Sequence, residues 1–224
     1  MWIHKNFSNQ QLINHYTFFY QEIMGVIWLG LGYFIASAIG YRILSITPTL
    51  NDSNLWSTLL IEAVLGICIL SSLFKQQYSC LIGKNMCTLY DIGWVIGQLI
   101  LLFLGIHVIN NGYLALNLHH ATNIVYTHQA SILTILIFSF CNACYEESIL
   151  LGYLLHRLCT KNIGIAILVS LLIRLSYHIH YDFLGLIHIA LFGLVVSFNY
   201  LCLGRIAPAV LTHALYDVIA LSNL

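Results

Sequence analysis

The chain has 224 residues, of which 60% are hydrophobic and only 7% are charged, and its mean hydropathy is +0.87. A soluble domain carries about 25% charged residues, so this chain has too little polar surface to face water on all sides. Lys+Arg and Asp+Glu balance at 8 each, which gives no basic surface for nucleic acid. The composition therefore indicates an integral membrane protein.

Seven stretches are long and apolar enough to cross a bilayer as helices, which takes about 20 residues each. They cover residues 21–44, 55–74, 86–109, 129–157, 163–180, 184–203 and 206–222. A β-barrel would need alternating strands of about 10 residues, and the sequence contains no such pattern. We expect an all-α fold, a polytopic helical transmembrane bundle with about seven spans.

Positively charged loop residues predict how this bundle is oriented. One side of the predicted topology holds the N-terminus together with Lys5, Lys75, Lys84, Arg157, Lys161 and Arg205. The other side holds Arg42 alone. We therefore expect a cytoplasmic N-terminus. The first 20 residues contain no removable signal peptide, and we expect the chain in a bacterial inner membrane.

Ionisable residues inside the predicted spans are the unusual feature, because a central Asp, Lys or Arg costs about 2.5–3.5 kcal/mol on insertion scales. Such groups must face one another or a wet cavity. The C-terminal half contains Glu146, Glu147, Arg174, His178, His188, His213 and Asp217. Glu62, in an earlier span, has no evident partner, and an accessory role in a site is one interpretation of it.

Residue spacing brings some of these groups onto common helix faces. Arg174 and His178 are four residues apart, as are His213 and Asp217, and side chains at this spacing share a face. A single buried pair of this kind can simply lock two helices together. Because ionisable groups occur on three successive C-terminal helices, we favour a shared site.

Glu146 and Glu147 are adjacent and differ by about 100° around a helix, so they cannot point the same way. One can face a cavity while the other faces a neighbouring helix. A carboxylate beside imidazoles suits general acid–base catalysis. Two histidines and one carboxylate can also bind zinc and leave a position for water, and Glu146, His178 and His213 are the candidate ligands.

Three motifs follow one another in this half of the chain. They are EESILLG (146–152), RLSYH (174–178) and LGRIAPAVLTHALYD (203–217). Their order resembles the CPBP family of intramembrane proteases, the CAAX-prenyl-protease and bacteriocin-processing or Abi family, whose pattern is EE-x3-R, F-x3-H and H-x3-N/D. The resemblance covers about residues 140–222. Leu151 stands where the family has Arg, and our hypothesis is that Arg174, in the place of the family Phe, substitutes for it.

The resemblance implies hydrolysis of a peptide bond at a water-accessible cavity in the membrane. It assigns the general base to Glu146, support of the site to Glu147, positioning of water or proton donation to His178, and oxyanion stabilisation to His213 with Asp217. No cofactor is certain, and zinc is an option. The expected partners are membrane lipid and a hydrophobic or lipidated peptide or protein substrate, with no nucleic acid.

We divide the chain into N-terminal transmembrane helices, 1–130, and a catalytic transmembrane core, 131–224. Two alternatives to a protease stay open. A non-catalytic scaffold or bacteriocin-immunity protein on the same fold is favoured by the Leu151 departure. A proton-coupled transporter would also need intramembrane ionisable groups, although the sequence shows no internal repeat of the kind transporters use.

Overall fold

The computed structural model describes residues 9–46, 49–74, 88–116 and 128–222. Three lysines behind the predicted orientation, Lys5, Lys75 and Lys84, lie outside these residues.

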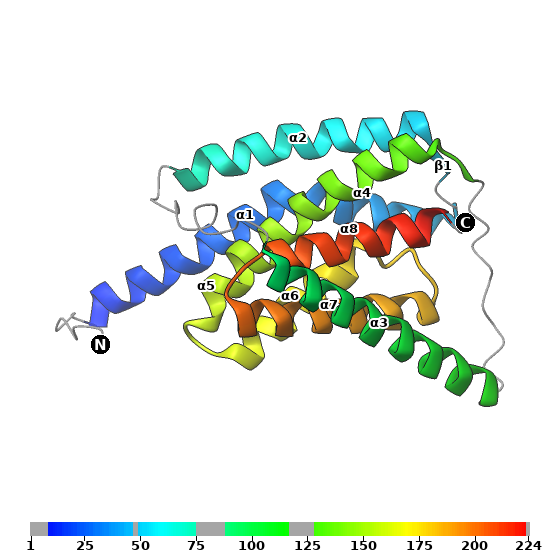
Figure 1. Cartoon of the computed structure of the whole chain (residues 1–224). Helices are drawn as coiled ribbons and strands as arrows, with labels where there is room; N and C mark the ends of the chain where they lie inside the picture. The colour runs from blue at the N-terminus through cyan, green and yellow to red at the C-terminus, as the bar shows by residue number, and fades with distance from the viewer. Residues whose placement is uncertain (1–8, 47–48, 75–87, 117–127, 223–224) are drawn as a thin grey trace.

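Helices make up almost all of the described chain (Figure 1). In order they are α1 (Asn9–Leu44), α2 (Asp52–Phe74), α3 (Leu89–Ala115), α4 (Ile132–Glu147), the π-helix η2 (Ser148–Leu155), α5 (His156–Cys159), α6 (Ile163–Tyr177), α7 (Phe183–Leu203) and α8 (Ala207–Ser222). Two short strands, β1 (Leu50–Asn51) and β2 (His128–Gln129), pair in parallel. The prediction of an all-α polytopic bundle is confirmed.

Within the described residues, five helical segments are long and apolar enough to cross a membrane. They are Phe19–Leu44, Asp52–Ile69, Leu89–Ala115, Ile132–Cys159 and Phe183–Leu203. The remaining two predicted spans correspond to the shorter apolar helices α6 and α8. Successive segments run in alternate directions, and the two chain ends lie at opposite ends of the bundle (Figure 1). The protein is therefore an integral membrane protein whose helices cross repeatedly.

Polar side chains and one glycine set the ends of the C-terminal helices. Asn162 accepts a hydrogen bond from the backbone N–H of Ile165 at 3.0 Å and begins α6. Asp182 accepts from the N–H of Gly185 at 2.7 Å and begins α7. Gly204 ends α7 with φ of 64°, a left-handed conformation that favours glycine. These ends fix the register of the helices that carry the polar residues.

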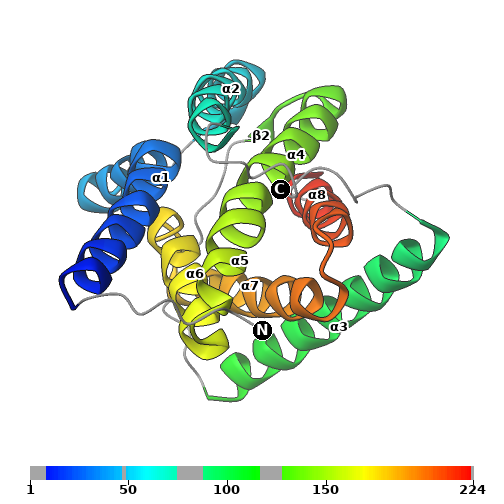
Figure 2. The same cartoon turned by 90° about the vertical axis from the view of Figure 1, so that its left-hand side faces the viewer.

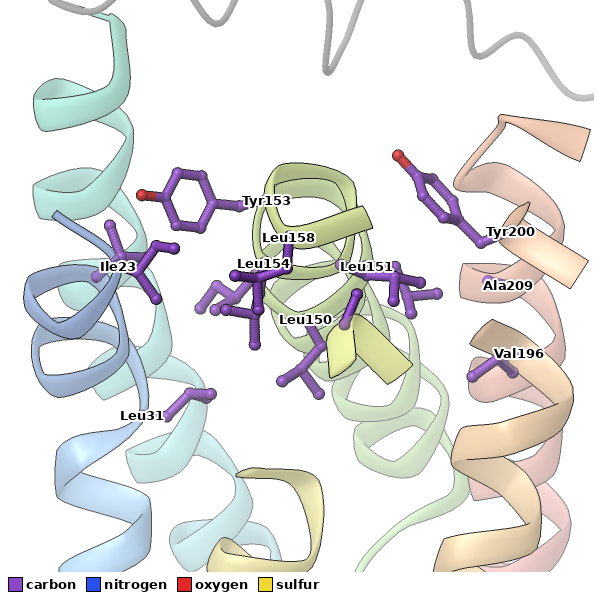
Figure 3. Packing of buried hydrophobic residues seen from close by; sticks show 14 of the residues in the cluster. Ile23, Leu31, Leu150, Leu151, Tyr153, Leu154, Leu158, Val196, Tyr200 and Ala209 are labelled. Carbon is purple, nitrogen blue, oxygen red and sulfur yellow. The ribbon is translucent and has the colours of Figure 1, made fainter. Parts of the chain in front are cut away.

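The span predicted at 129–157 is one rod with an unusual middle section. It begins as α4, continues through η2 over eight residues, and finishes as α5. Seven residues of η2 are buried: Ile149, Leu150, Leu151, Gly152, Tyr153, Leu154 and Leu155. Figure 3 shows several of them among side chains of neighbouring helices. A π-helix widens the turn, and here it follows Glu146 and Glu147 directly.

The N-terminal helices pack directly on the C-terminal ones. Helix α4 contacts both α2 and α8, α1 contacts α6, and α3 contacts α7 and α8. Figure 2 shows α3 crossing the outer side of the bundle beside α7 and α8. A division of the chain at residue 130 stays a prediction.

Candidate active site

A cavity of about 430 Å³ lies among α1, α2, α4, α6, α7 and α8. Five of the six predicted site residues line it: Glu146, Arg174, His178, His213 and Asp217. The sixth, Glu147, is fully buried behind Glu146 and faces neighbouring helices instead. The two glutamates therefore point in different directions, as their 100° separation predicts.

Glu147 is held by side chains from two other helices. The Nη2 group of Arg174, on α6, donates to both carboxylate oxygens of Glu147 at 2.8 Å. The Nδ1 atom of His213, on α8, lies 2.6 Å from Glu147 Oε1. These bonds join α4, α6 and α8 at one point. A buried carboxylate with such partners is fully satisfied.

Arg174 is 2% exposed, and the backbone of α7 makes room for it. A Cβ atom on Gly193 would lie 3.2 Å from the Arg174 Cδ atom and 2.9 Å from a methyl group of Leu171. The guanidinium carbon lies 5.1 Å from the centre of the Phe192 ring, a cation–π distance. Leu151 is fully buried in the hydrophobic core. The positive charge beside Glu147 therefore comes from α6 and not from position 151.

Glu146 presents its carboxylate to the cavity and is oriented from α6. Its Oε2 atom accepts a hydrogen bond from the Tyr177 hydroxyl and lies 3.4 Å from Nη1 of Arg174. The side-chain amide of Asn142, one turn earlier on α4, can donate to Oε1 of Glu146 at 3.3 Å and to Oε1 of Glu62 at 2.8 Å. One carboxylate oxygen is thus fixed by two donors, and the other faces the polar part of the cavity.

His213 lies between two carboxylates. Its Nδ1 atom contacts Glu147, and its Nε2 atom is 3.4 Å from Oδ2 of Asp217, four residues later on the same helix. The edge of the Phe192 ring packs against the imidazole, with ring centres 4.9 Å apart. When Glu147 accepts from Nδ1–H, the Nε2 atom is left for the cavity.

His178 lies just past the last residue of α6. Helix α6 ends at Tyr177, three residues before the predicted end, and His178 is its C-cap. The last turn of α6 consequently directs Arg174 and Tyr177 at Glu146. His178 lines the cavity beside the rings of Tyr177 and His180. Its Nδ1 atom has no hydrogen-bond partner among the described residues.

The possible metal ligands in the structure can be compared with the predicted zinc site. Among the described residues, Glu146, Glu147 and His213 form a group whose possible ligand atoms lie within 4.8 Å of one another. This group contains Glu147 in place of the predicted His178.

The two glutamates in this group already have other partners. Arg174 occupies both oxygens of Glu147 and approaches one oxygen of Glu146, and its guanidinium would repel a divalent cation. A catalytic zinc takes three protein ligands, and the oxygens of Glu147 are not free to supply one. The group therefore does not fit a zinc ion.

Two polar residues that line the cavity, Asn142 and Tyr177, were not predicted as part of the site. Glu62, for which an accessory role was one interpretation, lines it too. Asn142 lies four residues before Glu146, so helical spacing alone places it on the same face. Glu62 is an intramembrane carboxyl group, which is by default a functional candidate. The hydrogen bond from Tyr177 had no sequence pattern to predict it.

Comparison with known proteins gives one result. Residues 128–219 match the sequence model of the family described as type II CAAX prenyl endopeptidase, Rce1-like. The matched segment contains all six predicted site residues, and it excludes Glu62. This confirms the family expected from the three motifs. Comparisons with curated proteins and with solved structures gave no match.

Proposed function

The chain belongs to the Rce1-like family of type II CAAX prenyl endopeptidases, and we propose that it hydrolyses a peptide bond of a membrane-associated or hydrophobic peptide by glutamate-activated water. The observation that carries this proposal is the position of Glu146. Its carboxylate is buried, lines a cavity large enough for a peptide segment, and is oriented by Tyr177 and Arg174.

In the proposed mechanism, Glu146 takes a proton from a water molecule in the cavity. The hydroxyl of Tyr177 and the guanidinium of Arg174 hold Oε2, which leaves Oε1 to accept that proton. The water oxygen attacks the substrate carbonyl carbon, and the carbonyl oxygen becomes an oxyanion. Glu146 then returns the proton to the leaving nitrogen, as general acid–base catalysis requires.

His213 is the proposed donor to the oxyanion. As an imidazolium, His213 keeps its Nδ1–H on Glu147 while its Nε2–H faces Asp217 at 3.4 Å, a distance long enough for a substrate oxygen to compete for that second hydrogen. Glu147 fixes the imidazole through Nδ1, as the carboxylate of a catalytic triad fixes its histidine. His178 lines the cavity, and we assign it to positioning the attacking water.

Arg174 takes the ordering role that the family gives to an arginine at position 151. Its two bonds to Glu147 and its approach to Glu146 supply the positive charge that Leu151 lacks. This geometry favours an active protease over a non-catalytic scaffold or bacteriocin-immunity protein. A proton-coupled transporter is a further alternative, and no specific contact in the structure favours it.

The test is cleavage of a panel of hydrophobic and prenylated peptides by the detergent-purified protein, followed by mass spectrometry. Wild type is compared with Glu146→Ala and His213→Ala, each with and without a chelator. We expect cleavage by wild type only, at the same rate with the chelator. Cleavage by Glu146→Ala at the wild-type rate would refute the mechanism. Loss of wild-type cleavage in the presence of the chelator would indicate that the protein uses a metal ion such as zinc.

The membrane orientation belongs to the same proposal. Helix α5, which carries Arg157, the link from α5 to α6 with Lys161 and the link from α7 to α8 with Arg205 lie at the end of the bundle where α1 begins (Figure 1). Arg42 is in the last turn of α1, at the other end. The positive-inside rule then places the N-terminus in the cytoplasm, and we propose a bacterial inner membrane. Cysteine labelling from each side of the membrane, at Lys161→Cys and Arg42→Cys, tests this topology.

A further inference from the structure

Glu62 is a buried carboxyl group of the cavity wall that the proposed reaction does not use. It lies on α2, outside the segment that matches the family. The residue is 4% exposed and lines the same cavity as Glu146 and Asp217. Its Oε2 atom has no hydrogen-bond partner among the described residues. A buried acceptor without a donor is costly, so this atom is a candidate to receive one from a bound molecule.

Asn142 cannot satisfy the acidic groups that surround it. Its side-chain amide has one donor end and one acceptor end. One end lies 2.8 Å from Glu62 and 3.3 Å from Glu146, and the other lies 3.4 Å from Asp217. Whichever way the amide is turned, at least one carboxylate faces its acceptor oxygen. The structure therefore leaves this corner of the cavity short of hydrogen-bond donors.

The charges on the cavity wall lead to the same conclusion. Three carboxylates line it: Glu62, Glu146 and Asp217. Two cations stand against them among the described residues: Arg174, whose bonds at 2.8 Å go to Glu147 behind the wall, and His213, which is charged when both of its nitrogens carry hydrogen. With Glu147 included, four carboxyl groups face these two cations. A positively charged group would neutralise the excess negative charge at short range.

Aromatic rings complete the surroundings of this corner. Phe34, Phe138 and Tyr145 line the cavity together with Glu62. Aromatic faces attract ammonium and guanidinium groups and also pack against their hydrocarbon stems. A Lys or Arg side chain therefore matches the acidic and the aromatic parts of the wall together.

We propose that Glu62, with Asp217 and Asn142, forms a subsite for a positively charged side chain, Lys or Arg, of the peptide substrate. This inference rests on the proposed function, since it names the substrate class of the same cavity. It makes Glu62 a specificity-determining residue. An ammonium group brings three donors, enough for Glu62 Oε2, Asp217 and a ring face or water.

The experiment uses fluorescein-labelled peptides of leucine, valine and alanine with a single lysine, moved through every position. Each is matched by a peptide with norleucine at the same position, which keeps the apolar stem and removes the charge. Cleavage is measured as kcat/KM for wild type, Glu62→Gln and Glu62→Asp in detergent. Glu22→Gln is the matched control, since Glu22 pairs with Arg157 and Tyr153 away from the cavity.

We expect wild type to prefer lysine over norleucine at one position by about 10- to 100-fold, the range for a charge-assisted hydrogen bond. Glu62→Gln abolishes this preference, and Glu62→Asp and Glu22→Gln retain it. If Glu62 had only a structural role, Glu62→Gln would lower kcat/KM for the lysine and the norleucine peptide alike and leave the ratio of the two values unchanged. No preference in wild type, or an equal preference in Glu62→Gln, overturns the proposal.

Binding of the same peptides separates this inference from the proposed function. Dissociation constants are measured by fluorescence anisotropy, which requires no cleavage. If no peptide is cleaved but the lysine peptides bind wild type more tightly than Glu62→Gln, the subsite stands and the proposed hydrolysis fails. If cleavage occurs and the dissociation constants show no dependence on Glu62, the subsite fails and the hydrolysis stands.

Discussion

Replacing Arg174 by methionine keeps most of the side-chain length and removes the guanidinium. The change deletes two bonds of 2.8 Å to Glu147 and the contact of 3.4 Å with Glu146. Both glutamates are buried. Because the lost charge sits between them, the variant leaves two carboxylates near each other without their cation.

Removing one partner of a buried ion pair costs about 3–5 kcal/mol, because the remaining charge is uncompensated. We expect a loss of about this size in the free energy of unfolding of Arg174→Met. Arg174→Lys keeps the charge but has one nitrogen in place of the two that reach Glu147 and Glu146 separately, so its loss is about half as large. Removing both partners, in Glu147→Met with Arg174→Met, costs less than Arg174→Met alone.

The assay is SDS-induced unfolding of the detergent-solubilised protein, followed by tryptophan fluorescence and circular dichroism. The four proteins are compared in the same mixed micelles. A loss below about 1 kcal/mol in Arg174→Met, the size of a surface ion pair, would refute the inference that this guanidinium holds α4 and α6 together. If Glu147→Met with Arg174→Met were less stable than Arg174→Met alone, the loss could not be attributed to an uncompensated charge on Glu147.

Three further outcomes follow from single contacts. Tyr177→Phe removes a hydrogen bond to Glu146 and should lower kcat about 10- to 100-fold with little change in KM; an unchanged kcat would exclude this bond from the mechanism. Leu151→Arg places a charge in the hydrophobic core while Arg174 already occupies Glu147, so we expect a loss of at least 3 kcal/mol in the unfolding assay, and a stable variant would contradict that. Asp91→Asn weakens an ion pair of 2.6 Å with Arg205; we expect a destabilised protein whose kcat/KM on the best peptide stays within about twofold, and a collapse of activity in folded protein would show that α3 affects the site.

The helices were predictable because a helix that crosses a membrane needs a long apolar stretch, and such stretches stand out in the sequence. The predicted 184–203 and 206–222 differ by one residue from the starts of α7 and α8. The predicted 163–180 was wrong at its end, since α6 stops at Tyr177. No periodicity in SILLGYLL distinguishes a π-helix from an α-helix, because the seven residues after Ser148 are all buried and give no polar face. Its form depends on the helices packed around it.

The separate directions of Glu146 and Glu147 were predictable, since adjacent residues on a helix diverge by about 100°. The partners of Glu147 were not. They depend on the relative depth of α4, α6 and α8, which spacing along a single helix does not give. The short α6 puts Arg174 opposite the glutamates. Glu62 comes to the cavity from 84 residues upstream of Glu146, through packing of α2 on α4.

The measurement that tests the account most directly is kcat/KM for Glu146→Gln on the peptide that wild type cleaves best. Glutamine keeps the size of the side chain and its place beside Tyr177 and removes its ability to accept a proton from water. We predict a fall of at least about 100-fold, the usual contribution of a general base, with Glu22→Gln near the wild-type rate. Cleavage by Glu146→Gln at the wild-type rate would contradict the central claim that Glu146 activates the attacking water.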